Sequence, residues 1–369
     1  MRVVHTSDWH LGLESWSQTR SINRLPETQK ALNTLVEYVK KENIDLVLIA
    51  GDVLHNRVSP RIEALDTLAR ILQQLSNEAP TILLLGNHDW RGLKMLRELN
   101  LNNLFVVDKP EILEIGDFKV FAMPHLDTQR ALDFGADPVS EAEKVVKEIL
   151  ANFSKEATSS KKNILLSHVM VEGSIESERE RNLQLHIKKS FFSSNFDYIA
   201  LGHIHNQSLV TTQPVTWYCG SPICLDFGEE HDKKGALVVD FSSEEPKVTQ
   251  IELPRKALMT LTLENYREST LDAMAKKIAT CDGYVRIVGK TRPSNEIRKY
   301  LMNSFENIVK VEFEHETESV DTKATLFQSD VLKLYSDYIN HNYTENAESM
   351  LRIFKRFLEE VEFSETPET

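Results

Sequence analysis

The first half of the chain alternates between short apolar runs and longer segments with apolar residues at helical spacing. Residues 44–50 (IDLVLIA) and 80–85 (PTILLL) are continuous apolar runs that are too short for helices. Such runs are typical of strands buried on both faces of a parallel sheet. Residues 26–42, 60–76 and 91–99 carry apolar residues three or four positions apart, the pattern of a helix that buries one face. We therefore expect an α/β fold with helices outside the sheet.

The pattern changes from residue 105 onward, where strands follow one another more directly. Residues 105–123 predict paired strands with Gly116-Asp117 as the turn. Together with the first half, this predicts two facing sheets flanked by helices, an αββα sandwich. The other elements predicted up to residue 241 are strands at 1–7, 163–167 and 197–201, a helix at 139–153, and antiparallel strands within 209–241.

The chain after Pro254 predicts two further regions. Residues 258–314 alternate strand, helix, strand, helix and strand, which indicates a small separate α+β unit. Residues 315–324 (HETESVDTKA) are polar and charged, as in a linker. Residues 326–361 predict a hairpin of two amphipathic helices whose apolar stripe must bury against something. The predicted domains are 1–253, 254–318 and 319–369.

Charge and cysteine content limit the classes of protein to which the chain can belong. The formal net charge of −13 argues against a surface that holds nucleic acid by charge everywhere, but a local patch with bound cations stays compatible with it. The simplest interpretation of the acidity is solubility. Three widely spaced cysteines predict neither a disulfide framework nor a zinc knuckle. The N-terminal MRVVH predicts a strand rather than a signal peptide, and no apolar run approaches the ~20 residues of a membrane helix, so we expect a cytoplasmic protein.

Five short clusters of Asp, His and Asn each follow a predicted strand. In open sheets, ligands bind where the carboxyl ends of strands and their loops converge. Residues that are far apart in the chain are therefore expected to meet in one site. The clusters are Asp8-Trp9-His10, Gly51-Asp52-Val53-Leu54-His55, Gly86-Asn87-His88-Asp89, Ser167-His168 and Gly202-His203-Ile204-His205.

These residue types are ligands for divalent metal ions. Carboxylate, imidazole and amide oxygen together suit manganese, with iron or zinc as alternatives, and the lack of cysteine ligands argues against a structural zinc site. A carboxylate can bridge two ions, and two ions ~3.5–4 Å apart form a clamp for in-line displacement at phosphorus. The glycines at 51, 86 and 202 are expected to let the backbone turn sharply beside the ligands.

The order of the clusters resembles that of a known family. The series D-x-H, G-D-x-x-H, G-N-H-D, H and G-H-x-H is similar to the motifs of the calcineurin-like metallophosphoesterase superfamily, and the resemblance covers about residues 1–245. Within it, the chain more closely resembles the SbcD nuclease family. The features that carry this closer resemblance are Ser7-Asp8-Trp9-His10-Leu11-Gly12, His55, Trp90, the run Gly220-Ser221-Pro222 and the run Asp226-Phe227-Gly228-Glu229-Glu230.

The resemblance implies a role for each residue of the clusters. It implies that His88 acts near the leaving-group oxygen, as proton donor or charge stabiliser, with Asp89 orienting its ring; a role limited to supporting the metals is the alternative for His88. It implies that His55 contacts the substrate or assists, with a structural histidine as the alternative. Asp52 would bridge two ions. The implied ligands are Asp8, His10, Asp52 and His205 for one ion and Asp52, Asn87, His168 and His203 for the other.

The same resemblance implies an activity and partners. The implied reaction is manganese-dependent hydrolysis of DNA phosphodiester bonds in double-strand-break repair, as a 3′-to-5′ exonuclease on duplex ends and an endonuclease on single strands and hairpins. The small α+β unit resembles a capping domain that recognises DNA, and the terminal hairpin resembles a segment that grips the coiled coil of an SbcC-type ATPase. A homodimer in a bacterial-type cytosol, associated with the nucleoid, is also implied.

Contact residues for these partners are predicted from position and pattern. Arginines near the motifs are candidates for phosphate contacts, apolar helix positions for the dimer interface, and the terminal apolar stripe for the ATPase. They are Arg20, Arg57, Arg61 and Arg91 for DNA; Leu65, Leu68, Leu72, Leu96 and Leu99 for the dimer; and Leu334, Tyr338, Met350, Leu351, Phe354, Phe357 and Leu358 for the ATPase.

Two other functions stay open. A generic metal-dependent phosphatase or phosphodiesterase would use the same core motifs, and the region after residue 254 together with His55 is what favours a nuclease. A scaffold that tethers DNA is the alternative outside enzymes, and the complete set of ligand types argues against it. The chain has no G-x-x-x-x-G-K-[ST] motif, so we do not expect it to be the ATPase itself.

Overall fold

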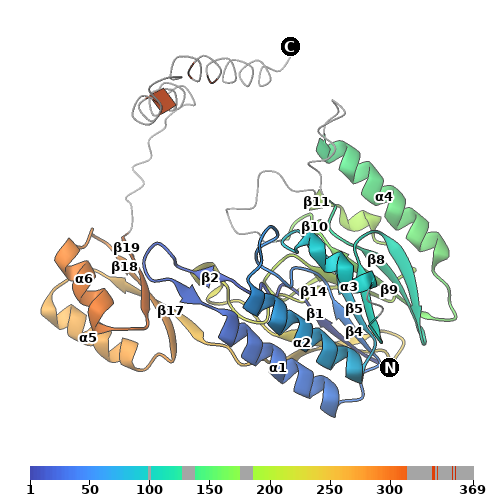
Figure 1. Cartoon of the computed structure of the whole chain (residues 1–369), viewed down its shortest axis with the longest axis horizontal. Coiled ribbons are helices and arrows are strands. Elements are labelled where there is room, and N and C mark those ends of the chain that lie inside the picture. The colour runs from blue at the N-terminus through green and yellow to red at the C-terminus, as the bar shows by residue number, and fades with distance from the viewer. Residues whose placement is uncertain are drawn as a thin grey trace. The chain divides into compact units, whose positions relative to one another are not determined.

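The computed structural model describes residues 1–98, 101–126, 138–174 and 186–313, together with residues 335, 336, 339, 351 and 354. The chain divides into two compact units, Met1–Glu314 and His315–Thr369. The first unit contains layered sheets and helices (Figure 1). This division into two units does not test the three domains predicted from the sequence, and they stay a prediction.

The first of two six-stranded sheets is mainly parallel. Its four strands from the first half of the chain run parallel, and the two later strands are added antiparallel at one edge. In the order in which they lie side by side, the strands are β16 (Lys247–Ile251), β15 (Ala236–Asp240), β1 (Arg2–Thr6), β4 (Leu46–Ile49), β5 (Thr81–Leu84) and β6 (Leu104–Val107).

The second six-stranded sheet has a parallel centre and an antiparallel strand at each edge. Two short ribbons lie outside the sheets, β2 (Glu14–Ser15) with β3 (Ile22–Asn23) and β10 (Met170–Val171) with β11 (His186–Ile187). The strands of the second sheet, in spatial order, are β13 (Ser208–Thr212), β14 (Val215–Tyr218), β12 (Tyr198–Gly202), β9 (Lys162–His168), β8 (Phe118–Met123) and β7 (Glu111–Ile115).

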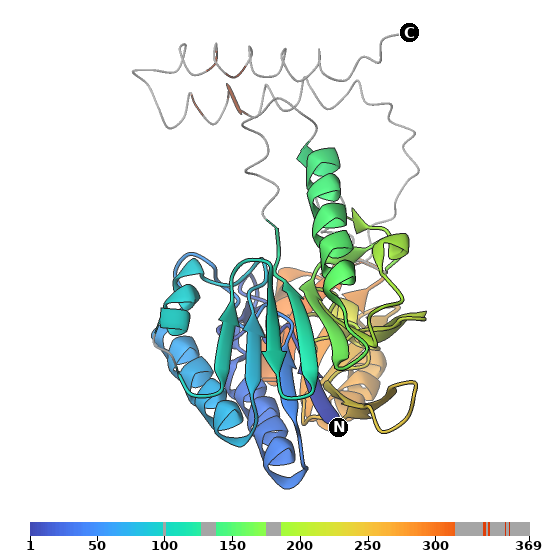
Figure 2. The same cartoon turned by 90° about the vertical axis from the view of Figure 1, so that its right-hand side faces the viewer.

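Helices cover the outer faces of the two sheets. Figure 1 shows α1 and α2 side by side on the first sheet, and Figure 2 shows α4 beside the strands of the second. The helical elements of this region are α1 (Leu25–Lys41), α2 (Ile62–Glu78), η1 (Arg91–Lys94), α3 (Met95–Glu98) and α4 (Pro138–Glu156), with the short turns η3 (Lys189–Phe191) and η4 (Phe227–Glu229).

The run IDLVLIA shows why the chain forms these layers. Successive side chains of a strand point to opposite faces of its sheet. In β4, Leu46 and Leu48 belong to the apolar core between the sheets, whereas Val47 and Ile49 belong to the core beneath α1 and α2. Both faces are therefore buried, as the continuous apolar run predicts. The predicted αββα sandwich is confirmed.

Two strands lie in a different sheet from the one that the local pattern predicts. Residues 105–123 form a hairpin only in part: β7 and β8 pair around Gly116-Asp117, but β6 lies beside β5 in the first sheet. Likewise β15 leaves the antiparallel series predicted for 209–241 and pairs with β1. The sequence does not distinguish these arrangements, because a short apolar strand fits a buried position in either sheet.

A three-stranded parallel sheet completes the first unit. Two helices connect its strands, and their core contains Met274, Leu301 and Ile287. Ser294 caps the second helix by accepting a hydrogen bond from the backbone N–H of Ile297 at 3.2 Å. The elements are β17 (Ala257–Leu263), α5 (Glu268–Ala279), β18 (Gly283–Gly289), α6 (Asn295–Ser304) and β19 (Ile308–Phe313), in the order predicted for residues 258–314.

Arg24, which precedes α1, connects the three-stranded sheet to the large sheets. Its side chain is completely buried, with the guanidinium 5.1 Å from the ring centroid of Trp16 and 4.9 Å from that of Tyr284. It donates hydrogen bonds to the Cys224 carbonyl at 2.7 Å and to the Glu27 carboxylate at 3.0 Å. A buried charge held in this way fixes several segments against one another.

The predicted dimer contacts stay a prediction, and the structure shows how exposed each of them is. Leu68 and Leu72 are buried in the core beneath α2, where they pack on their own sheet. Leu65 and Leu96 are half-buried against the same core, and Leu99 lies outside the described residues. The exposed apolar side chains here are instead Val58 and Ile62 near the start of α2, Met95 and Leu101.

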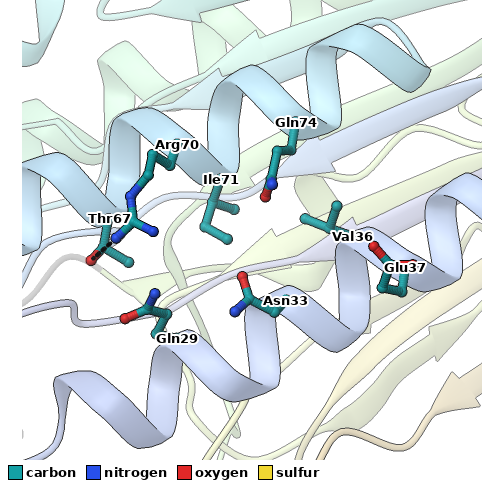
Figure 3. A pocket seen from close by; sticks show the side chains of 8 residues that line it. All are labelled: Gln29, Asn33, Val36, Glu37, Thr67, Arg70, Ile71 and Gln74. Carbon is teal, nitrogen blue, oxygen red and sulfur yellow. Dashed lines mark hydrogen bonds between the residues drawn. The ribbon is translucent and has the colours of Figure 1, made fainter.

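Two further features lie outside the clusters of predicted metal-binding residues. A cavity of about 330 Å³ between α1 and α2 is lined mainly by polar side chains, among them Gln29, Asn33 and Gln74 (Figure 3).

In the second unit, the Tyr335 ring stacks on Phe354 at 3.9 Å between centroids. Of the predicted ATPase contacts only Leu351 and Phe354 are described; Leu334, Tyr338, Met350, Phe357 and Leu358 lie outside the described residues. No helix among the described residues is long and apolar enough to span a membrane.

We expect Arg24→Met to lower the free energy of unfolding by about 3–5 kcal/mol, because it leaves the Glu27 carboxylate without its buried partner. Urea denaturation followed by circular dichroism measures this change. Arg70→Met is the matched control, since Arg70 pairs with Asp66 on the exposed face of α2 and such pairs contribute about 0–1 kcal/mol. Equal, small effects of both substitutions would contradict the role of Arg24.

Candidate metal centre

The parallel strands of both large sheets deliver the predicted cluster residues to one place. Asp8 and His10 follow β1, and the clusters that contain Asp52 and Asn87 follow β4 and β5. His168 ends β9, and two further histidines, His203 and His205, follow β12. The structure brings these residues together in groups whose ligand atoms lie within 4.8 Å of one another. The groups are Asp8, His10 and His205; Asp52, His168 and His203; and His10, His55 and His88.

The backbone at these strand ends adopts a conformation that L-residues rarely adopt. Asp8, His10, Asp52 and His203 have φ values of 52°, 44°, 53° and 101°. Among the described residues, only Trp16 and Asn103 are further non-glycine positions with positive φ. Such residues cluster at functional sites, where the surrounding structure offsets the strain. The strand-end turns therefore aim these side chains into the cluster.

Two of the predicted glycines are required by close packing beside the ligands. A Cβ atom on Gly51 would lie 2.5 Å from Nδ1 of His168, and one on Gly86 would lie 2.2 Å from Oδ1 of Asp52. Gly51 also has a φ of 93°, which favours glycine. The sharp turn expected of these glycines is present at Gly51, whereas Gly86 is required by the close approach of Asp52.

Asp52 lies between the two groups of predicted ligands. Its Oδ2 is 3.8 Å from Nε2 of His10 on one side and 3.4 Å from Nε2 of His168 on the other. Nε2 of His10 is in turn 3.2 Å from Nε2 of His205. On the second side, Oδ1 of Asn87 is 2.9 Å from Nε2 of His168. This is the arrangement expected of one carboxylate shared by two metal sites.

The outer nitrogens of the histidines are held by acceptors. Nδ1 of His168 lies 2.7 Å from the Ala50 carbonyl oxygen, and Nδ1 of His205 lies 2.8 Å from Oε1 of Glu229. These oxygens only accept, so each imidazole donates from Nδ1 and turns Nε2 into the cluster, where it could bind a metal ion in place of a proton. Such outer contacts orient metal-binding imidazoles.

Three buried carboxyl groups, those of Asp8, Asp52 and Asp89, lie at the centre of the cluster. Burial alone would raise the pKa of Asp52, but His168, His10 and His88 together outweigh burial and hold that pKa well below its ordinary value. Burial raises the pKa of Asp8, and burial with the nearby Asp52 charge raises the pKa of Asp89 to about 7. Burial would lower the pKa of His168, but Asp52 raises it to about 9. The cluster therefore contains several buried carboxyl groups and few positive charges. Bound cations would remove this imbalance.

Asp89 holds the loops together and does not orient His88 as predicted. Both of its oxygens accept backbone hydrogen bonds, from Asp52 N–H at 2.9 Å, Leu54 N–H at 2.9 Å and Gly86 N–H at 2.8 Å. The carboxylate therefore fixes the β4 and β5 loops relative to each other.

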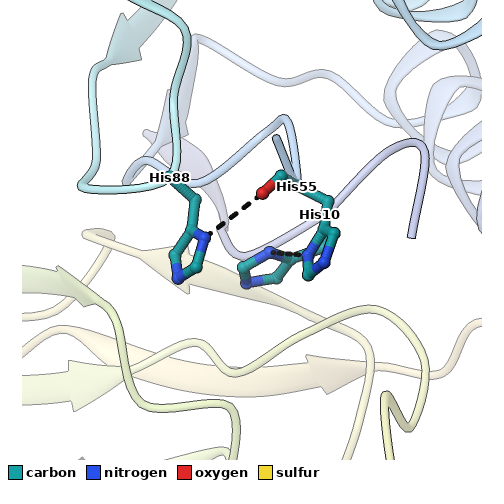
Figure 4. Close-up of side chains that lie close together, drawn as sticks. All are labelled: His10, His55 and His88. Atoms are coloured by element: carbon teal, nitrogen blue, oxygen red, sulfur yellow. Dashed lines mark hydrogen bonds between the residues drawn. The ribbon is translucent and has the colours of Figure 1, made fainter. Parts of the chain in front are cut away.

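His55 and His88 form a pair at the edge of the cluster (Figure 4). Their rings are stacked with centroids 5.8 Å apart, and Nδ1 of His88 lies 3.2 Å from the carbonyl oxygen of His55. Nδ1 of His55 lies 3.4 Å from Nδ1 of His10. His88 therefore donates from Nδ1, and its Nε2 is left as the atom that can meet a substrate.

The predicted DNA-contacting arginines occupy different surroundings. Arg20 donates hydrogen bonds to the carbonyls of Met302, Phe305 and Glu306 at the end of α6, so it joins the three-stranded sheet to the core. Arg61 pairs with Glu14 at 2.5 Å, with half of its side chain exposed. Arg57 is exposed at the rim, and Arg91 lies in η1 next to Trp90.

The strand-end pattern missed Glu229 and Lys234. Glu229 contacts His205, and Lys234 contacts Glu229 at 2.7 Å from a fully buried position. Glu229 stands in the run that carries the family resemblance, but neither residue follows a strand that points at the cluster. No local signal identified their role.

Carboxylate, imidazole and amide donors on both sides of Asp52 suit a pair of divalent metal ions. The residues that could hold one ion are Asp8, His10, Asp52 and His205, and those that could hold the other are Asp52, Asn87, His168 and His203.

Comparisons with known proteins show what the chain is similar to. The family described as calcineurin-like phosphoesterase matches residues 1–207. The SbcD component of the nuclease SbcCD from Staphylococcus epidermidis is 30% identical over 261 residues, which are 66% of this chain and 67% of the relative. The SbcD component from Staphylococcus saprophyticus is 28% identical over 296 residues, 75% of each chain. A solved dimetal phosphatase from Danio rerio aligns with a TM-score of 0.42 and 11% identity, over 68% of this chain and 98% of that one.

The family match covers more than half of the chain and includes every strand-end cluster. With the paired ligand groups around Asp52, it confirms the resemblance seen in the motifs: the chain belongs to the calcineurin-like phosphoesterase family.

Proposed function

We propose that this chain is a two-metal nuclease that hydrolyses DNA phosphodiester bonds. The observation that carries the proposal is the position of Asp52 between two groups of buried ligands. The SbcD relatives, which are named as nucleases, align with this chain over two thirds or more of their own length. This likeness supports a nuclease among the activities of the family.

The metal ions, when bound, would activate a water molecule and neutralise charge on the phosphoryl oxygens. Asp8, Asp52 and the ligand histidines hold them, with their outer hydrogen bonds fixing the rings. Asp89 keeps the two loops that carry Asp52 and Asn87 in register through its backbone contacts. The chain thus supplies a rigid cage whose geometry is set before the substrate arrives.

His88 is proposed to act beside the departing 3′ oxygen. Its Nδ1 proton is engaged by the His55 carbonyl, so only Nε2 can meet the leaving group, and a protonated ring would donate from there. His55 supports this placement through its backbone carbonyl and contacts the substrate with its ring. Both rings are half-buried at the edge of the cluster, where a phosphodiester can approach.

Manganese as the metal, 3′-to-5′ cleavage of duplex ends and cutting of single strands and hairpins are proposed from the family resemblance. So are recognition of DNA by residues 254–318, dimerisation through exposed side chains such as Ile62 and Met95, and an SbcC-type ATPase that binds the segment after residue 318. Arg57, Arg61 and Arg91 remain candidates for phosphate contacts. Arg20 is a weaker candidate, because its guanidinium is engaged with α6.

A generic phosphatase or phosphodiesterase is the second candidate, because the dimetal core is common to such enzymes. The three-stranded sheet and the segment beyond it favour the nuclease.

We expect labelled duplex and hairpin DNA to be cut with manganese at rates well above those for a small phosphodiester ester. Asp52→Asn should remove both ions and all cleavage, as measured by metal analysis, whereas Asp66→Asn on α2 should change neither. Faster turnover of the small ester than of DNA would favour the second candidate.

His88→Ser should lower the cleavage rate by ~10²–10⁴-fold, the range for loss of a general acid, and leave the metal content unchanged. Metal analysis of the purified variant beside a cleavage assay tests both parts. Loss of both metals in this variant would show that His88 is a ligand instead. His231→Ser is the control, since His231 is exposed and belongs to none of the three ligand groups.

A chain that ends at residue 324 should keep its nuclease activity and lose the ability to co-purify with a coiled-coil ATPase. The apolar stripe that we assign to the partner lies beyond this point. Co-expression with the ATPase followed by affinity purification measures the association. Retention of the ATPase by the shortened chain would refute the assignment.

A further inference from the structure

Glu229 places a carboxylate against the outer nitrogen of one ligand histidine, His205. Its Oε1 lies 2.8 Å from Nδ1 of His205. Its Oε2 accepts hydrogen bonds from Nζ of Lys234 and from the backbone N–H of Leu225, at 2.7 Å and 2.8 Å. With both oxygens engaged, the carboxylate has one orientation available to it.

Lys234 holds the same histidine from its backbone. Its side chain is completely buried, and Nζ donates to the carbonyl oxygen of His205 at 2.7 Å as well as to Ser221 Oγ at 3.0 Å. A buried lysine requires a paired negative charge, and Glu229 supplies it. The two residues therefore clamp His205 at its ring and at its main chain together.

His168, a histidine of the other site, has a weaker support. Its Nδ1 faces the neutral carbonyl of Ala50. A carboxylate partner raises the donor strength of an imidazole more than a neutral acceptor does. The two metal sites are therefore supported unequally, and the Glu229 carboxylate serves the site of Asp8, His10 and His205.

The segment that carries Glu229 is itself anchored. Phe227 of η4 packs in an apolar cluster with Leu258 and Tyr284 of the three-stranded sheet. The next carboxylate, Glu230, accepts a hydrogen bond from the backbone N–H of Thr260 in β17 at 2.9 Å. Neighbouring glutamates thus have separate tasks, which provides a control for an experiment.

We propose that Glu229, paired with Lys234, is a positioning residue for His205 and sets the affinity of one of the two metal sites, that of Asp8, His10 and His205. This inference rests on the two-metal function proposed above. It assigns Glu229 no contact with substrate, so its effect reaches the reaction only through the metal that His205 holds.

The test is manganese binding to the full chain, with the Glu229→Gln variant compared to the unchanged protein. Equilibrium dialysis with metal analysis gives the two affinities, and electron paramagnetic resonance distinguishes coupled ion pairs from single ions. We expect Glu229→Gln to weaken one site by ~10–100-fold, the usual effect of losing an outer partner, and to leave the other unchanged. At intermediate manganese the variant should show single-ion signals where the unchanged protein shows coupled pairs.

Glu230→Gln is the matched control, with the same chemical change one residue along, and should keep both affinities. Glu229→Asp, which retains the charge on a shorter arm, should restore part of the lost affinity, and thermal unfolding checks that each variant is folded. Unchanged binding in Glu229→Gln, or equal weakening of both sites, would overturn the inference. If the unchanged protein itself binds fewer than two ions, the proposed two-metal function fails instead.

Discussion

The burial of Asp8, Asp52 and Asp89 in one cluster is the constraint on which the rest of the structure depends. Removing a carboxylate from water costs several kcal/mol unless donors or cations compensate it. Asp89 is compensated by backbone N–H groups of the β4 and β5 loops. Asp52 also accepts a hydrogen bond from the backbone N–H of His88, and Asp8 accepts from that of His203. The other neighbours of these two carboxyl groups are imidazoles, which are metal ligands rather than fixed positive charges. The chain therefore forms a stable fold around a deficit of positive charge.

The two large sheets make this burial possible. Parallel strands end together, so the loops after β1, β4 and β5 converge with those after β9 and β12. Each of these strands is apolar on both faces and held in the core, which makes the strand ends rigid. Left-handed backbone at the ligand positions and glycines beside them then bring the side chains close. A site built on strand ends in this way needs little reorganisation to hold its ions.

The supports of the cluster reach well beyond its own loops. His205 is clamped by Glu229 and Lys234, and the segment that bears Glu229 packs on the three-stranded sheet. Arg24 and Arg20 tie the loop after β1 to that sheet from the other side. The small sheet is thus part of the scaffold of one metal site, in addition to the DNA recognition that we propose for it.

The sequence by itself determined the layers and the residues that meet. Continuous apolar runs such as IDLVLIA required strands buried on both faces, and the polar clusters that follow them supplied the residues that gather around Asp52. Only the tertiary structure decided which sheet β6 and β15 join, that Leu68 and Leu72 are core residues, that Asp89 serves the backbone, and that Glu229 supports His205. The physical reason is that periodicity and strand-end position are local properties of the chain. A hydrogen bond between residues far apart, or the choice between two equally apolar faces, depends on where the whole chain has already packed.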